Sequence, residues 1–191
     1  MGKQYSQLPD NLTDFIARQK IFFVGTAAAD GRVNVSPKGM DTLRVVAANR
    51  VVWLNLTGSG NETAAHLREN GRIVLMFNAF SGPPKIVRFH GQGRVLAEDS
   101  PEFAALLPSL SLPPESRRLV RGIVVVDVER ISDSCGFGVP RMDLVAERDQ
   151  LQRWSETQEA KHGETWKTRY MREKNTRSID GMPGYDLGKP W

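Results

Sequence analysis

Short segments rich in β-branched and aromatic residues recur along the first part of the chain, and most are separated by turn signals. The runs at 21–27 and 33–38 flank Asp30-Gly31, a dipeptide typical of tight hairpin turns. In the second run, Val33 and Val35 alternate with polar neighbours, as in a strand with two different faces. Further runs of this kind are LRVVA (43–47), VVWLNLT (51–57), RIVLMFNAF (72–80), PPKIVRFHGQGRVLA (83–97) and GIVVVDVERI (122–131).

Few helices are expected between these strands. The segment LPDNLTDFIARQ predicts an opening helix, because Leu12, Phe15 and Ile16 fall on one face. SPEFAALL predicts a short helix with Ser100 as its cap. Six or seven strands joined mostly by short turns favour an antiparallel barrel or sandwich over a parallel α/β sheet. The fold class is therefore mainly β.

The last fifty residues differ in composition from the strand-rich part. They are polar and rich in helix formers, yet they carry apolar side chains at intervals, which argues against a disordered tail. We predict two units: a domain at 1–145 and a helical extension at 146–191, which packs on the barrel or on a second subunit. The apolar anchors expected in and just before this extension are Leu144, Leu151, Trp154, Trp166 and Tyr170.

Composition narrows the classes of function. The chain has 191 residues, enough for one full core, and 40% of them are hydrophobic. No apolar run is long enough to span a bilayer, and the single cysteine, Cys135, suits a reducing cytoplasm. The net charge of +4 comes without a basic run interleaved with aromatic residues, so we expect neither nucleic acid nor membrane as a partner. The three histidines are far apart, and we expect no metal site.

The glycine-rich turn in LTGSGNETAAHLRENGR, residues 56–72, has two interpretations. In the first it only joins a strand to a helix: Ser59 and Glu62 match a capping box, and Asn70-Gly71 would end the helix. In the second it binds a phosphate, since free N–H groups and the positive end of the helix dipole converge at a helix start. Lys38, which follows an early strand, could supply the charge. The spacing alone leaves both open.

Three blocks together indicate a family: SPKG (36–39), TGSGNETAAH (57–66) and SCG-x-GVP (134–140). With them, the chain resembles the pyridoxamine 5'-phosphate oxidase-like flavoproteins, over roughly residues 10–145. The resemblance implies a six-stranded antiparallel split β-barrel with short flanking helices and a helical C-terminal extension. It also implies a homodimer that binds two FMN molecules between its subunits and acts on a small-molecule substrate.

The resemblance also implies where FMN binds. A basic residue of the strand ending at Lys38 would meet the flavin phosphate, together with the start of the helix after the glycine-rich turn. Relatives that oxidise pyridoxamine phosphate usually carry Ser-Arg-Lys at positions 61–63, where this chain has Asn-Glu-Thr, so another substrate is expected. The candidate cofactor-binding residues are Val35, Ser36, Lys38, Leu56, Thr57, Asn61, Glu62 and Thr63.

Several alternatives stay open at this point. The chain could be an FMN-dependent oxidoreductase, a deazaflavin-dependent reductase, or a protein that binds FMN or haem without turnover. A deazaflavin has a long anionic tail and would need cations beyond Lys38 and Arg44. Cys135 could be a reactive thiol and His90 a proton donor, although packing roles are the commoner ones for such residues. No residue is assigned as a catalytic acid or base.

Overall fold

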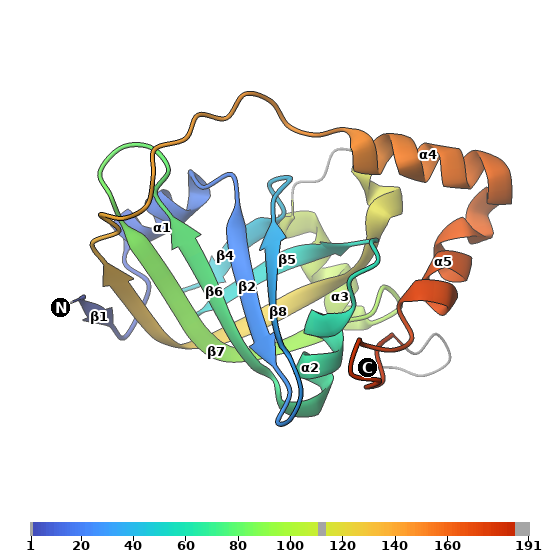
Figure 1. Cartoon of the computed structure of the whole chain (residues 1–191), viewed down its shortest axis with the longest axis horizontal. Helices are drawn as coiled ribbons and strands as arrows, with labels where there is room; N and C mark the ends of the chain where they lie inside the picture. The colour runs from blue at the N-terminus through green and yellow to red at the C-terminus, as the bar shows by residue number, and fades with distance from the viewer. Residues whose placement is uncertain (1, 111–113, 186–191) are drawn as a thin grey trace.

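The computed structural model describes residues 2–110 and 114–185, and its centre is one antiparallel sheet (Figure 1). The strands follow the order β3-β2-β6-β7-β8-β5-β4, and the short β1 pairs with β8. They are β1 (Gln4–Tyr5), β2 (Phe22–Ala27), β3 (Val33–Lys38), β4 (Leu43–Ala47), β5 (Arg50–Leu56), β6 (Arg72–Asn78), β7 (Ile86–Leu96) and β8 (Val120–Ser134).

The sheet curves into a split barrel whose opening lies between β3 and β4, the two ends of the strand order. The mainly antiparallel β fold is therefore confirmed. Within the described residues the sheet has eight strands rather than six, because all seven apolar runs form strands and β1 adds a two-residue pairing. The longest strand, β8, pairs with β7, β5 and β1 and thereby holds both halves of the sheet together.

The barrel interior is filled by alternate side chains of the strands. Trp53, Phe77 and Phe89 are almost fully buried, and Phe22 contacts both Trp53 and Phe77 with ring centroids 5.9 Å apart. Burial of a large aromatic side chain contributes about 1.5–3 kcal/mol relative to its exposure. These rings fix the strand registers, since a one-residue slip would turn each of them towards solvent.

The first three α-helices of the described chain lie at the ends and edges of the barrel, whereas the last two form an extension beside it (Figure 1). α1 buries Leu12, Phe15 and Ile16 against the core, as its periodicity predicted. None of the helices in residues 2–110 and 114–185 combines the length and apolarity needed to cross a membrane. The helices are α1 (Asp10–Ala17), α2 (Glu62–Asn70), α3 (Pro101–Leu106), α4 (Gln150–His162) and α5 (Trp166–Lys174), with 3-10 turns at Leu107–Ser109, Pro114–Leu119 and Gly163–Thr165.

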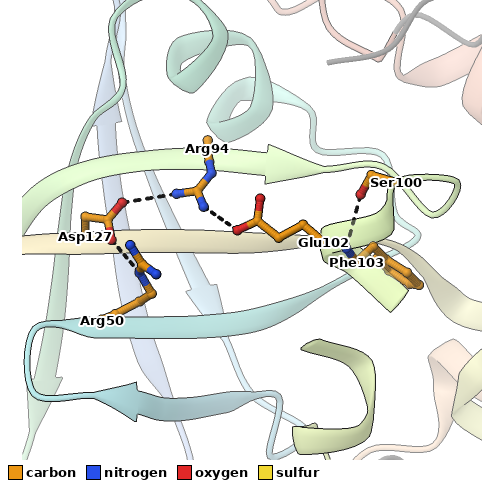
Figure 2. A network of polar contacts seen from close by, with 6 residues as sticks. All are labelled: Arg50, Arg94, Ser100, Glu102, Phe103 and Asp127. Atoms are coloured by element: carbon orange, nitrogen blue, oxygen red, sulfur yellow. Dashed lines mark hydrogen bonds and ion pairs between the residues drawn. The ribbon is translucent and has the colours of Figure 1, made fainter. Parts of the chain in front are cut away.

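A polar network ties α3 to the sheet (Figure 2). Asp127 on β8 accepts from Arg50 Nε at 2.6 Å and from Arg94 Nη1 at 3.1 Å, and Arg94 also pairs with Glu102 on α3. Ser100 caps α3 as predicted. The charged side chains of the network are about half exposed, so each pair adds at most about 1 kcal/mol. The network therefore orients α3 more than it stabilises the fold.

The C-terminal extension is helical, as expected. Figure 1 shows an extended segment that arches from the end of β8 to α4, and residues 140–150 of it are exposed throughout. Leu144 is 55% exposed and is therefore no anchor within this chain. Trp154 packs against Trp166 and Tyr170, with centroids 5.6 and 4.9 Å apart, which joins α4 to α5. Of the predicted extension, residues 186–191 lie outside the described part.

Candidate anion-binding site

The glycine-rich turn between β5 and α2 does not form the predicted capping box. The helix begins at Glu62, and its N-cap is Asn61, which makes no side-chain capping bond. Glu62 is thus the first residue of the helix rather than the third, so it cannot reach back to Ser59. Its Oε1 instead accepts a hydrogen bond from the backbone N–H of Ile179, at 3.0 Å. Gly71 ends the helix as predicted, with a left-handed φ of 70°, and Ala64 and Leu67 of the helix are buried.

A small polar pocket lies where this turn meets β3 and β8, and we refer to it as the cradle. Its enclosed space of about 30 Å³ could take only the end group of a ligand. Alternation along β3 directs Asn34, Ser36 and Lys38 towards it, while Val35 points to the opposite face. The lining residues are Asn34, Ser36, Lys38, Asn55, Gly60, Asn61, Glu62, Thr63, Ala64 and Arg121.

Lys38 is the first of two cations in the cradle. Burial lowers the pKa of its ammonium group from 10.5 to about 8, and the neighbouring Arg121 adds to this effect. Among the described residues no carboxylate pairs with Lys38. The folded protein thus keeps a partly desolvated charge that lacks a counter-ion, an arrangement that costs stability unless a ligand neutralises it.

Arg121 is the second cation, and it is not among the site residues predicted from the sequence. It is 6% exposed, and burial lowers the pKa of its guanidinium group. Its Nη1 donates to Gly58 O at 2.9 Å, and its Nη2 donates to Gly60 O at 2.6 Å. Two further acceptors are the side-chain oxygens of Asn175, at 2.8 Å, and Asn55, at 3.4 Å. All four acceptors are neutral, so the positive charge of Arg121 is not compensated by these hydrogen bonds.

Neutral side chains complete the wall formed by β3 and α2. Asn34 Nδ2 lies 3.1 Å from Thr26 Oγ1 and 3.2 Å from Thr63 Oγ1, and Ser36 Oγ donates to Asn34 Oδ1 at 3.0 Å. The network continues to His66, whose Nδ1 lies 3.0 Å from Thr26 Oγ1. Because these groups hold one another, Ser36 and Thr63 are fixed at the rim of the cradle.

Asn61 shows an unused capacity for hydrogen bonding. Its side chain is 3% exposed, yet neither Nδ2 nor Oδ1 has a partner among the described residues. A buried amide without partners costs about 1–3 kcal/mol, and this one lies against Gly184, where an added Cβ would overlap Asn61 Nδ2. Asn61 also lies at the N-terminus of α2, where the backbone favours anions. The two cations and the backbone N–H groups at the start of α2 fit a phosphate monoester, and the charge of the cations exceeds that of the one carboxylate in the lining, Glu62.

The other candidate residues have different positions. Thr57 directs both its N–H and its hydroxyl to Leu119 O, at 2.6 and 2.8 Å, and so closes the end of β5. Leu56 is half-buried in a second apolar cluster that includes Phe103 and Leu110. Val35 is 65% exposed on the outer face of β3. The structure therefore gathers five of the predicted residues at the cradle, namely Ser36, Lys38, Asn61, Glu62 and Thr63.

His90 and Cys135 lie outside the cradle lining. His90 borders a cavity of about 530 Å³ on the outer face of the sheet, together with Val33 and Val35. Partial burial lowers the pKa of His90, and Arg130 and Arg88 add to this effect. Cys135 is exposed. A further cavity of about 320 Å³ lies between α1 and β4.

Comparisons with known proteins agree with this architecture. The family model described as Pyridoxamine 5'-phosphate oxidase matches residues 8–135. The pyridoxamine 5'-phosphate oxidase family protein ustO of Aspergillus flavus is 36% identical over 195 residues, which cover 94% of this chain and 76% of that protein.

Solved structures share the fold at low identity. A single-residue variant of HupZ from Group A Streptococcus has a TM-score of 0.52 at 19% identity, covering 66% of this chain and 99% of that one. An FAD-binding protein from Mesorhizobium loti has a TM-score of 0.50 at 13% identity, covering 70% and 96%. Because the family model spans more than half of the sequence and the Aspergillus relative aligns along almost all of it, the chain belongs to the pyridoxamine 5'-phosphate oxidase family.

Proposed function

We propose that this protein binds FMN through its phosphate group in the cradle and is an FMN-dependent oxidoreductase with a small-molecule substrate. The observation that supports this most directly is that Lys38 and Arg121 line one small pocket, in which Glu62 is the only carboxylate among the described lining residues. The backbone N–H groups at the N-terminus of α2 add donors at the same place. Membership of the family supports a flavin, and so does the fold shared with an FAD-binding protein.

We expect the residues around the cradle to have different roles in binding the phosphate. Lys38 would neutralise the phosphate, and the first N–H groups of α2 would donate to its oxygens. Ser36 and Thr63, held by Asn34, would restrict its position. When bound, FMN supplies the electron transfer, so the protein need not contribute a catalytic acid or base.

We further propose a homodimer with FMN between its subunits. β3 is an edge strand, and its outer face exposes Val33 and Val35 by 74% and 65%. Exposed apolar side chains on an edge strand are a liability in a monomer, and a second copy would cover them. The cradle itself is too small for a flavin ring, so the ring would lie outside it, where a partner subunit could contact it.

The absorption spectrum of purified protein titrated with FMN tests the proposal. We expect flavin bands that are shifted on binding and a saturable quenching of flavin fluorescence. A Soret band would instead indicate haem. Colourless protein that leaves the fluorescence of added FMN unchanged would contradict the proposal. A deazaflavin is less well supported, because Arg44 is already paired with Asp41 at 2.9 Å and Arg121 is buried beneath the turn.

The affinity for FMN should depend on pH through Lys38. Its pKa of about 8 means that the amine is charged at pH 7 and loses its charge as the pH rises through 8. A bound phosphate favours the charged amine, so FMN affinity should fall by up to about tenfold per pH unit above pH 8. Fluorescence titrations from about pH 7 to 9, where the phosphate stays a dianion, would measure this fall. An affinity that is constant over this range would exclude Lys38 as the anchoring charge.

A further inference from the structure

Residues 175–185, which we name the C-terminal strap, contact the back of the cradle from the far end of the sequence. Figure 1 shows the end of the described chain beside α2, after α5 has returned from the outlying helix α4. The family model ends at residue 135, so it does not include this segment. We propose that Asn175 and Tyr185 of the strap are positioning residues for the phosphate site, acting through Arg121 and the 58–60 turn. This inference rests on the proposed binding of FMN.

Asn175 connects the strap to both Arg121 and the glycine-rich turn. It has no exposed surface; its Oδ1 accepts from Arg121 Nη1 at 2.8 Å, and its Nδ2 donates to Gly58 O at 2.9 Å. A longer bond of 3.3 Å runs to Ser59 O. One amide therefore fixes the guanidinium and the turn relative to each other.

Tyr185 holds the opposite side of Arg121. Its ring is 3% exposed and lies 5.1 Å from the guanidinium carbon, a cation–π contact in a desolvated place. Its hydroxyl accepts a hydrogen bond from Asn55 Nδ2, while Asn55 Oδ1 accepts from Arg121 Nη2. Tyr185, Asn55 and Arg121 thus each contact the other two, and the aromatic ring among them comes from the strap.

These contacts affect the ligand side of the turn through the geometry of the peptide bond. Arg121 draws the carbonyl oxygens of Gly58 and Gly60 towards itself. In a trans peptide the following N–H points the opposite way, and no cis bond occurs among the described residues. The N–H groups of Ser59 and Asn61 therefore point away from Arg121. Backbone N–H groups that point to the same side of a turn favour an anion on that side.

The strap and the phosphate should consequently strengthen each other. Both favour the same arrangement of Arg121 and the turn, and coupling between two binding events is reciprocal. Loss of the strap contacts should weaken the interaction with the phosphate while leaving contacts to the flavin ring unchanged. The affinity ratio of FMN to riboflavin, which lacks the phosphate, isolates this effect.

The test compares Asn175→Ala and Tyr185→Phe with the unmodified chain. In Asn175→Ala we expect the ratio of FMN to riboflavin affinity to fall by about tenfold, as for loss of a hydrogen bond to a charged group. Tyr185→Phe keeps the ring and removes only the hydroxyl, so a smaller fall is expected, and this variant remains informative if the first does not fold. The matched control is Asp180→Asn, which alters the contact of the strap with Arg32 on the β2–β3 hairpin and should leave the ratio unchanged.

Hydrogen exchange of residues 175–185 provides the second readout, and FMN should slow it while riboflavin should not. If both variants keep the ratio of the unmodified chain, the positioning role is wrong. If a variant weakens FMN and riboflavin equally, its role is structural only, which also overturns the inference. If the unmodified chain binds neither compound, it is the proposed function that fails.

Discussion

Replacement of Arg121 by methionine is expected to lower the free energy of unfolding by about 3 kcal/mol and to reduce the affinity for FMN to about that for riboflavin. Removal of a buried charge relieves its desolvation, which opposes this loss. The acceptor oxygens of Asn55 and Asn175 would, however, stay buried without a donor, at about 1–3 kcal/mol each. Release of Gly58 O and Gly60 O would also free the turn. The lost hydrogen bonds should therefore outweigh the relief of desolvation, and the variant should be less stable.

Urea unfolding monitored by tryptophan fluorescence would measure this change. Arg130→Met on the same strand is the matched control, because Arg130 is exposed and such substitutions usually stay within about 0.5 kcal/mol. Arg121→Lys keeps the charge but cannot reach four acceptors, so an intermediate loss is expected. A variant Arg121→Met that is as stable as the unmodified protein would show that Arg121 does not hold the turn.

Replacement of Lys38 by methionine should affect binding and stability in opposite directions. FMN affinity should fall by about 30- to 150-fold, since one charge-assisted interaction of about 2–3 kcal/mol is lost. The free energy of unfolding should rise by about 1–2 kcal/mol at pH 7, because the lowered pKa shows that the folded state disfavours the charged amine. This destabilisation of the folded state by the charged amine is fully present below pH 8 and disappears as the pH approaches 10.5.

Fluorescence titration and urea unfolding on one preparation would give both quantities. Lys161→Met removes an equal charge from the exposed surface of α4 and should change neither by much. Riboflavin affinity should stay the same in Lys38→Met. A variant that binds FMN normally, or one that is clearly less stable, would show that Lys38 is an ordinary structural lysine.

The strands could be predicted because their signals are local. The alternation of apolar and polar residues beside Asp30-Gly31 predicted the β2–β3 hairpin, and the β8 run was apolar enough to indicate burial. The helix after the glycine-rich turn was also expected, but its cap was not. Glu62 is held by the N–H of Ile179, a residue 117 positions away, and no spacing rule contains such a contact.

Arg121 was missed for a related reason. In the sequence it is a single arginine before the apolar run of β8, which resembles an ordinary residue at a strand end. Its role depends on the pairing of β5 with β8, which brings it to the carbonyl groups of Gly58 and Gly60. The positive charge at the cradle was therefore underestimated, whereas the placement of Lys38, Ser36 and Thr63 in its lining follows from the β3 run and the turn, which are recognisable locally.

Calorimetric titration of the unmodified protein with FMN and with riboflavin measures how much the phosphate group contributes to flavin binding in the cradle. Two charged or charge-assisted interactions with the phosphate predict that FMN binds at least about 100-fold more tightly at pH 7. Inorganic phosphate should compete with FMN and not with riboflavin. Equal affinities for FMN and riboflavin would contradict anchoring by the phosphate in the cradle, because the phosphate would then contribute nothing to binding.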